Sequence, residues 1–203
     1  MRSHRQHVAW RGGLMQKLLA ALALGAACLP LAGCFPLMAT GVGVGAMMID
    51  DRRSSGAYID DEVIENRILI KLSERLDARA HVNPTSFNRI VLLSGEVPTD
   101  EAKRIAEDVA RGQANVRNVV NELVVGPYTA FSTRSNDTLI TSKVKARFVD
   151  ANKFSANHVK VVTENGVVFL MGMVKPQEAA DASEIARHTG GVARVVKVFE
   201  YVN

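Results

Sequence analysis

Aromatic residues are scarce in this chain of 203 residues. They make up 5% of the sequence, and the single tryptophan is Trp10. Proteins that bind single-stranded nucleic acids stack the bases on aromatic side chains, so we expect no nucleic-acid partner. Hydrophobic residues make up 47% and charged residues 23%. This balance is that of a globular protein, and it excludes general disorder and a protein with many membrane spans.

Cysteine is rarer still, with only Cys28 and Cys34 in the chain. Cys28 lies in an apolar run, residues 18–32, that follows a basic start and is too short to cross a bilayer comfortably. This pattern is typical of a signal peptide. The run leads into Leu31-Ala32-Gly33-Cys34, which resembles a bacterial lipobox. The resemblance implies cleavage after residue 33 and acylation of Cys34, whereas the alternative is a core helix with a buried cysteine.

Lipoprotein processing excludes a disulfide and a thiolate metal site, because Cys28 leaves with residues 1–33 and the Cys34 sulfur is in a thioether. At roughly 0.8 kcal/mol per buried methylene, three acyl chains make dissociation negligible. Phe35 stands where an Asp commonly signals inner-membrane retention, so we expect the periplasmic face of the outer membrane. Residues 34–57 are predicted to be a flexible tether that lies on the bilayer or packs against the folded body. Met15 is a second candidate start.

An excess of positive charge is also absent from the expected mature protein. The first 33 residues hold four basic and no acidic side chains, and without them 21 basic side chains balance 21 acidic ones. Overall charge therefore predicts no polyanionic partner. The balance is nevertheless uneven, since residues 58–127 hold 9 basic and 12 acidic side chains and residues 128–203 hold 10 and 7. These opposite charges favour either docking between the halves or contact of the second half with an anionic surface.

The two halves are copies of one unit, at an offset of 76 to 77 residues. His81-Val82 matches His158-Val159, and Leu92–Val97 matches Phe169–Val174. Each copy begins with apolar residues at every fourth position, which predicts a helix. We expect its N-cap at Asp60 or Asp61 in the first copy and at Asn136 or Asp137 in the second.

A hairpin, a second helix and a last strand complete each copy. The hairpin signal is clearest at Asn165-Gly166, because this dipeptide favours positive backbone φ. A right-handed crossover makes the last strand parallel to its neighbour. The fold class is therefore α+β, with two tandem αββαβ modules, each a small three-stranded mixed sheet covered on one face by two helices. The other face is left for solvent, a partner or the second module.

This unit resembles the BON domain. The resemblance rests on the αββαβ order, on a glycine after the apolar run of the second strand (Gly95 and Gly172), on the Asn-Gly turn at Gly166, and on Gly191 with its trailing valines. It implies a non-enzymatic module that binds phospholipid. The first copy departs from the pattern, since Asn88-Arg89 replaces Asn-Gly, Asn115 replaces a glycine and Pro84 falls in a strand. We therefore assign lipid binding to the second copy.

The helix predicted over Asp137–Asp150 is the candidate binding element. Ile140, Val144 and Phe148 recur every four residues and should face the core, while a second apolar edge lies beside three cations. Such a surface suits the headgroup region of an anionic bilayer, where each Lys or Arg contributes about 1 kcal/mol. A contact between the modules is the alternative. The six candidate residues are Leu139, Lys143, Lys145, Ala146, Arg147 and Val149.

Catalytic and metal-binding motifs are not evident, so we expect no enzyme activity, no cofactor and no metal. His81 and His158 precede the first strand of separate modules, and Ser94-Gly95 lacks the context of a nucleophile elbow. The sequence favours a lipoprotein that binds anionic phospholipid membranes through its second module and supports envelope integrity. The alternative is a periplasmic adaptor that binds outer-membrane assembly, cell-wall or division-site proteins through an open sheet face or the basic helix.

Overall fold

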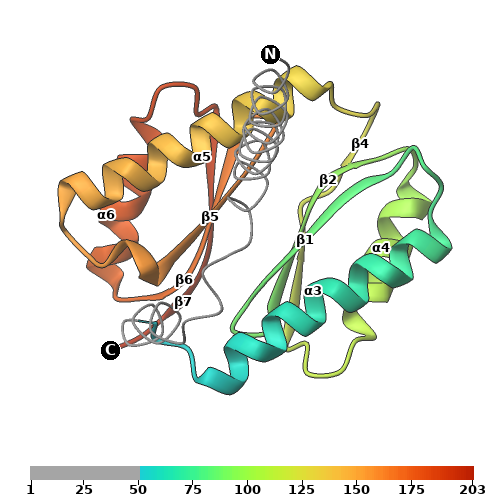
Figure 1. The fold of residues 1–203 in the computed structure, drawn as a ribbon, viewed down its shortest axis with the longest axis horizontal. Coiled ribbons are helices and arrows are strands. Elements are labelled where there is room, and N and C mark those ends of the chain that lie inside the picture. Colours follow the sequence, from blue (N-terminus) through green and yellow to red (C-terminus); the bar gives the residue numbers. More distant parts are fainter. Residues whose placement is uncertain (1–50) are drawn as a thin grey trace, which may run out of the picture. The chain divides into compact units, whose positions relative to one another are not determined.

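The structure, a computed structural model, describes residues 51–203 (Figure 1). The predicted signal peptide, Cys34 and most of the predicted tether lie outside the described residues. Among the described residues, no helix combines the length and the apolar character that a membrane span requires. The described residues belong to one compact unit, which contains both modules.

Each module has the predicted order of helices and strands. The first contains α3 (Ser55–Arg75), β1 (His81–Phe87), β2 (Ile90–Val97), α4 (Asp100–Arg111), β3 (Asn118–Asn121) and β4 (Val124–Val125). The second contains α5 (Phe131–Ala151), the short 3-10 helix η2 (Ala156–His158), β5 (Val159–Glu164), β6 (Val167–Val174), α6 (Pro176–Arg187) and β7 (Arg194–Tyr201). The first helix of each module begins before the residues at which the sequence predicted it.

The sheets confirm the α+β fold class and the predicted strand directions. In each module the hairpin strands are antiparallel, and the strand after the second helix is parallel to the second strand of the hairpin. In the first module this last strand is split into β3 and β4, which both pair with β2. Pro84 lies in β1, at the edge of the strand order, where a missing amide proton is tolerated.

The predicted N-caps are wrong in both modules. Helix α3 is capped by Ser54, whose hydroxyl accepts a hydrogen bond from the amide of Ala57, and Asp61 lies about two turns further on. Helix α5 begins at Phe131 after Ala130, which offers no side-chain cap. The prediction failed because the apolar row that marks the buried face starts only where each helix first meets its own sheet.

The repeated aspartates instead hold the hairpin turns. The Asp61 carboxylate accepts hydrogen bonds from the amides of Asn88 and Arg89, at 2.8 and 2.7 Å. In the second module the Asp137 carboxylate accepts from the amides of Asn165 and Gly166, both at 2.8 Å. The turn residues Asn88 and Arg89 have φ values of 50° and 65°, so the first module keeps the turn that Asn-Gly makes in the second.

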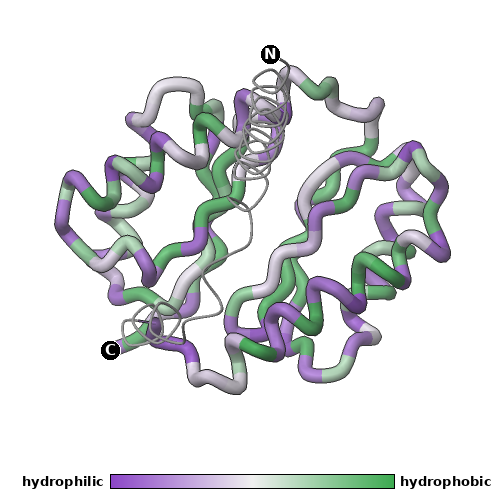
Figure 2. The backbone as a smooth tube through the Cα atoms, viewed as in Figure 1, coloured by the Kyte–Doolittle hydropathy of each residue, from purple (hydrophilic) through white to green (hydrophobic). Residues whose placement is uncertain are grey.

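Alternate residues of each sheet enter different cores. In β2, Val91 and Leu93 pack with helices α3 and α4, whereas Leu92 belongs to a third cluster on the opposite face of the sheet. That cluster contains residues of both modules, and Figure 2 shows the hydrophobic stretches along the strands. Its buried members are Phe87, Leu92, Phe169 and Met171. The sheet faces are therefore packed on one another, which corrects the expectation of an open face for the adaptor alternative.

Ion pairs between the modules run in both directions. Lys160 contacts Glu65 at 2.9 Å, and Arg194 contacts Glu122 at 3.7 Å, so these two pairs join a basic residue of the second module to an acidic residue of the first. Arg117 of the first module contacts Glu200 of the second at 2.9 Å. The unequal charge of the two halves therefore accounts for only some of the ion pairs between the modules.

Candidate functional site

Helix α5 presents one face to its module and the other to solvent. Its buried side carries Ile140, Val144 and Phe148, which are fully enclosed in the core of the second module. Phe148 also packs edge to face on Phe154, at 5.1 Å between ring centroids. These contacts fix the rotation of the helix about its axis, so they determine which side chains face outward.

All six residues that the sequence singled out on this helix are exposed. Leu139 is 58% exposed and Val149 is 65% exposed. At 100° per residue, Leu139, Lys143 and Ala146 lie within about 60° of one another on the outward side. Lys145 and Arg147 lie on opposite flanks of this face. The arrangement is an apolar centre with cations beside it, which is the pattern of helices that lie in a membrane interface.

Arg147 is hydrogen-bonded within the protein, although the sequence analysis named it as a lipid-binding residue. Its guanidinium donates a short hydrogen bond to the carbonyl oxygen of His188 and approaches the Thr189 hydroxyl at 3.4 Å. It thus satisfies a carbonyl at the C-terminal end of α6 and ties that helix to α5. Lys143 and Lys145 are therefore the two cations of the set that are best placed to meet an external anion.

Phe131 extends the same surface and was missed by sequence reasoning. It is 78% exposed and is the first residue of α5. It lies before the helix that the sequence predicted over Asp137–Asp150, because the buried apolar row begins only at Ile140. Its spacing of eight residues from Leu139, a little over two turns, is the signal that could have identified it. At 100° per residue, Phe131 and Val149 lie on the same side of the helix and Leu139 is about 80° from them, so the three belong to one broad outward face.

Helix α3, at the equivalent place in the first module, differs in charge rather than in exposed apolar area. Ile59 and Ile70 are each 59% exposed. However, α3 carries five acidic and three basic side chains, whereas α5 carries two acidic and four basic ones. An anionic bilayer would therefore attract α5 and repel α3.

The glycines named by the sequence lie where the chain is crowded or has positive φ. A Cβ atom at Gly95 would lie 2.1 Å from the carbonyl oxygen of His81, and one at Gly172 would lie 2.3 Å from that of His158. Both glycines therefore permit the two hairpin strands to approach each other. Gly166 and Gly191 have φ values of 74° and 101°. Asn115, at the position of Gly191 in the first module, adopts a φ of 69°.

The histidines lie in different surroundings. His158 is beside Glu178, at 4.0 Å from Nδ1 to the carboxylate. His81 lies 3.5 Å from Glu164 of the other module and close to Glu96. The sequence considered the histidines as a pair and did not identify these carboxylates. Glu96 is the cross-strand partner of His81 in the first hairpin, and only Glu164 is brought to His81 by the packing of the modules. Ser94 is buried and donates a hydrogen bond to the Asn83 carbonyl at 3.4 Å.

Comparison with known proteins gives the same division into modules. Residues 60–127 and residues 136–203 each match the BON domain. The chain is 37% identical over 175 residues to the outer membrane lipoprotein DolP of Haemophilus influenzae, with 85% of this chain and 91% of that protein covered. It is 39% identical to a 21 kDa hemolysin of Actinobacillus pleuropneumoniae, covering 75% and 79% of the two chains. It is 31% identical to osmotically-inducible protein Y of Escherichia coli, covering 69% and 72%.

Proposed function

Because the chain belongs to the BON domain family and is a dual-BON protein similar to DolP, we propose that it is a non-enzymatic lipoprotein of the outer membrane. Acylated Cys34 holds it on the periplasmic face. Its second module binds anionic phospholipid and so supports envelope integrity. In this proposal residues 1–33 are the signal peptide and residues 34–57 are the tether. The last residues of the tether already belong to helix α3, which begins at Ser55.

The observation that carries the proposal is the outward face of α5. This face combines the exposed apolar residues Phe131, Leu139 and Val149 with the exposed cations Lys143 and Lys145. Charges elsewhere on the second module, such as Lys160 and Arg194, are used in ion pairs with the first module. Lys145 and Val149 border a cavity that Glu62 and Phe87 of the first module also line, but both remain exposed, so this cationic and apolar face is still accessible.

The mechanism is avidity. Two cations near an anionic surface contribute about 2 kcal/mol, which is too weak for a soluble protein to bind by itself. An acyl anchor keeps the module at the membrane, so the second contact is effectively intramolecular and needs little affinity. The helix then senses the composition of the bilayer next to the anchor.

The test removes the two cations. The acylated full chain with Lys143→Gln and Lys145→Gln should lose about 2 kcal/mol of the contact between α5 and vesicles of phosphatidylglycerol, a loss of about 30-fold in the population of the bound orientation. Protection of α5 amides from hydrogen exchange on the vesicles measures this population. Vesicles of phosphatidylcholine should give little protection with either protein.

A matched control is available on α3. Arg67 and Lys71 are exposed beside Ile70, so Arg67→Gln with Lys71→Gln removes the same charge from the equivalent helix. This variant should keep the protection of α5. Equal protection of α5 in wild type and in the α5 variant, on anionic vesicles, would contradict the proposal.

The adaptor alternative keeps only the basic helix as its docking surface, since the sheet faces pack together. Retained crosslinking to outer-membrane assembly, cell-wall or division-site proteins by the α5 variant, together with lost vesicle contact, would show protein partners that do not depend on lipid.

A further inference from the structure

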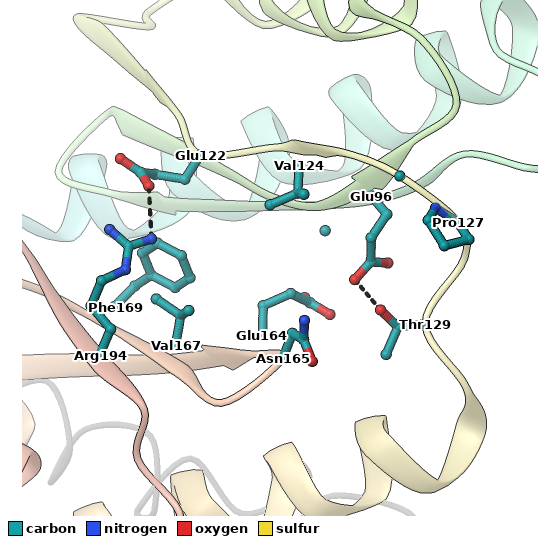
Figure 3. A pocket seen from close by; sticks show the side chains of 12 residues that line it. Glu96, Glu122, Val124, Pro127, Thr129, Glu164, Asn165, Val167, Phe169 and Arg194 are labelled. Carbon is teal, nitrogen blue, oxygen red and sulfur yellow. Dashed lines mark hydrogen bonds and ion pairs between the residues drawn. The ribbon is translucent and has the colours of Figure 1, made fainter.

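His81, Glu96 and Glu164 come together at the junction of the two modules. His81 is the first residue of β1, Glu96 lies near the end of β2, and Glu164 ends β5 of the other module. One ligand atom of each residue lies within 4.8 Å of the other two. Figure 3 shows the Glu96 and Glu164 side chains reaching into the space between the modules.

Glu96 is buried and incompletely hydrogen-bonded. It is 5% exposed, and its Oε1 accepts a short hydrogen bond from the Thr129 hydroxyl. Its Oε2 is buried and has no hydrogen-bond partner among the described residues. A carboxylate oxygen in this situation costs several kcal/mol unless something compensates its charge. The unpartnered atom therefore points to a missing cationic ligand.

The formal charges around the cluster sum to a value that a divalent cation would offset. Glu164 is surrounded by the carboxylates of Glu96 and Asp137 and by the cation of Arg134. With neutral His81, these four groups sum to a formal charge of minus two, which one divalent cation would offset. Arg134 stacks over the Tyr128 ring, at 4.9 Å from its centroid. Burial and the neighbouring carboxylates of Glu96 and Asp137 raise the pKa of Glu164 to about 7.

We propose that His81, Glu96 and Glu164 form a binding site for a divalent transition-metal cation, and that the bound cation clamps the two modules together. Two ligands come from the first module and one from the second, so the cation joins elements that are otherwise held by side-chain packing and ion pairs. This site is independent of the proposed lipid contact on α5.

Zn²⁺ suits this donor set best. Zinc binds both imidazole nitrogen and carboxylate oxygen and accepts four ligands, whereas Ca²⁺ and Mg²⁺ prefer six or more oxygen ligands. Ligands about 2.0 Å from a tetrahedral zinc lie about 3.3 Å apart, and His81 Nε2 is already 3.5 Å from Glu164 Oε1. Small side-chain movements of Glu96 would complete the set. A water molecule takes the fourth position, on the side of an adjoining cavity of about 290 Å³.

Surrounding contacts already orient the three ligands. The Thr129 hydroxyl binds Glu96, the Asn83 amide binds Glu164, and the His81 ring packs edge to face on Tyr128 at 5.5 Å between centroids. Such outer contacts fix ligand geometry in known metal sites.

The experiment titrates metal-stripped full chain with ZnCl₂ in detergent at pH 7.5, with Cys28→Ser and Cys34→Ser so that no thiol competes. We expect uptake of one equivalent that raises the melting temperature. His81→Asn and Glu96→Gln should each weaken this uptake about tenfold or more. His158→Asn is the matched control, because it changes the repeat-related histidine, and it should bind as the parent does.

Two results would overturn the site. One is the absence of zinc uptake by the parent protein, and the other is uptake that His81→Asn and Glu96→Gln both leave unchanged. Because His81 is partly exposed, its variant should fold, and circular dichroism checks this for both.

Discussion

At the residue scale, the most informative position is the aspartate repeated in both modules. Asp61 and Asp137 are 2% and 4% exposed, and each accepts two backbone hydrogen bonds from a hairpin turn. The sequence revealed the repetition, but both residues were interpreted as N-caps, because an aspartate just before an apolar helical row is commonly an N-cap. Their actual partners lie 27 to 29 residues away along the chain. Such a role cannot be read from a local pattern.

Asp137→Ala should therefore destabilise the protein by about 2 kcal/mol or more, because two turn amides lose a charged acceptor. Asp150→Ala is the control on the same helix, since Asp150 is exposed, and it should change the free energy of unfolding by less than about 0.5 kcal/mol. Urea unfolding of both variants measures the difference. Equal stability of the two variants would contradict the role of Asp137 in holding the turn.

At the element scale, the strands and the second helices were predictable and the starts of the first helices were not. The Asn165-Gly166 turn and alternating apolar residues determine the second hairpin through local backbone preferences. The first turns of α3 and α5 lack large buried apolar residues, since α3 buries only Ala57 there, so the periodicity marks them weakly. In α3 these turns are held by polar contacts. Arg53 pairs with both Asp51 and Asp61, at 2.6 and 2.9 Å.

The segment before α3 is also attached to α6. Arg52 contacts both carboxylate oxygens of Glu178, at 2.6 and 2.8 Å, and this hydrogen-bonded pair lowers the pKa of Glu178 to about 2. A carboxyl whose pKa is lowered on folding stabilises the protein above its unfolded pKa, near 4.5. That contribution is lost as the pH falls from 4.5 toward 2.

Arg52→Gln should lower the free energy of unfolding by about 1 kcal/mol at pH 7, and the difference from wild type should shrink as the pH falls below 4.5. Arg104→Gln is the control, because the Arg104–Glu101 pair is exposed on both sides, and it should have little effect at either pH. Thermal unfolding at pH 7 and pH 3 measures both. A loss of unfolding free energy in Arg52→Gln that is as large at pH 3 as at pH 7 would show that this loss does not come from the Arg52–Glu178 pair.

At the scale of the whole molecule, the sequence predicted two copies of one fold but not which surfaces remain free. The internal repeat and the resemblance to BON domains gave the modules, and the opposite charges of the halves were consistent with docking. Whether the sheet faces pack on one another depends on side chains such as Phe87 and Phe169, which come from different modules. The same packing brings Glu164 to His81 and Glu96, which are cross-strand partners in the first hairpin, so the complete cluster could not be predicted either.

The packing of the two sheets also explains why the candidate lipid surface lies on a helix. Among the described residues, most of the exposed large apolar side chains lie on α3 and α5, and the others are Val124, Val125, Tyr128 and Tyr201. Of these two helices, α5 has the positive charge. The central claim is therefore that α5, and not α3, contacts an anionic bilayer.

The most direct measurement places a tryptophan on each helix. Trp10 precedes Cys34, so cleavage of the signal peptide leaves a chain with no tryptophan. Leu139→Trp on α5 and Ile70→Trp on α3 then report from sites of nearly equal exposure, 58% and 59%. On phosphatidylglycerol vesicles, the acylated Leu139→Trp protein should show a blue-shifted emission and the Ile70→Trp protein should not. The same emission from both positions, or a shift at position 70 alone, would contradict the account.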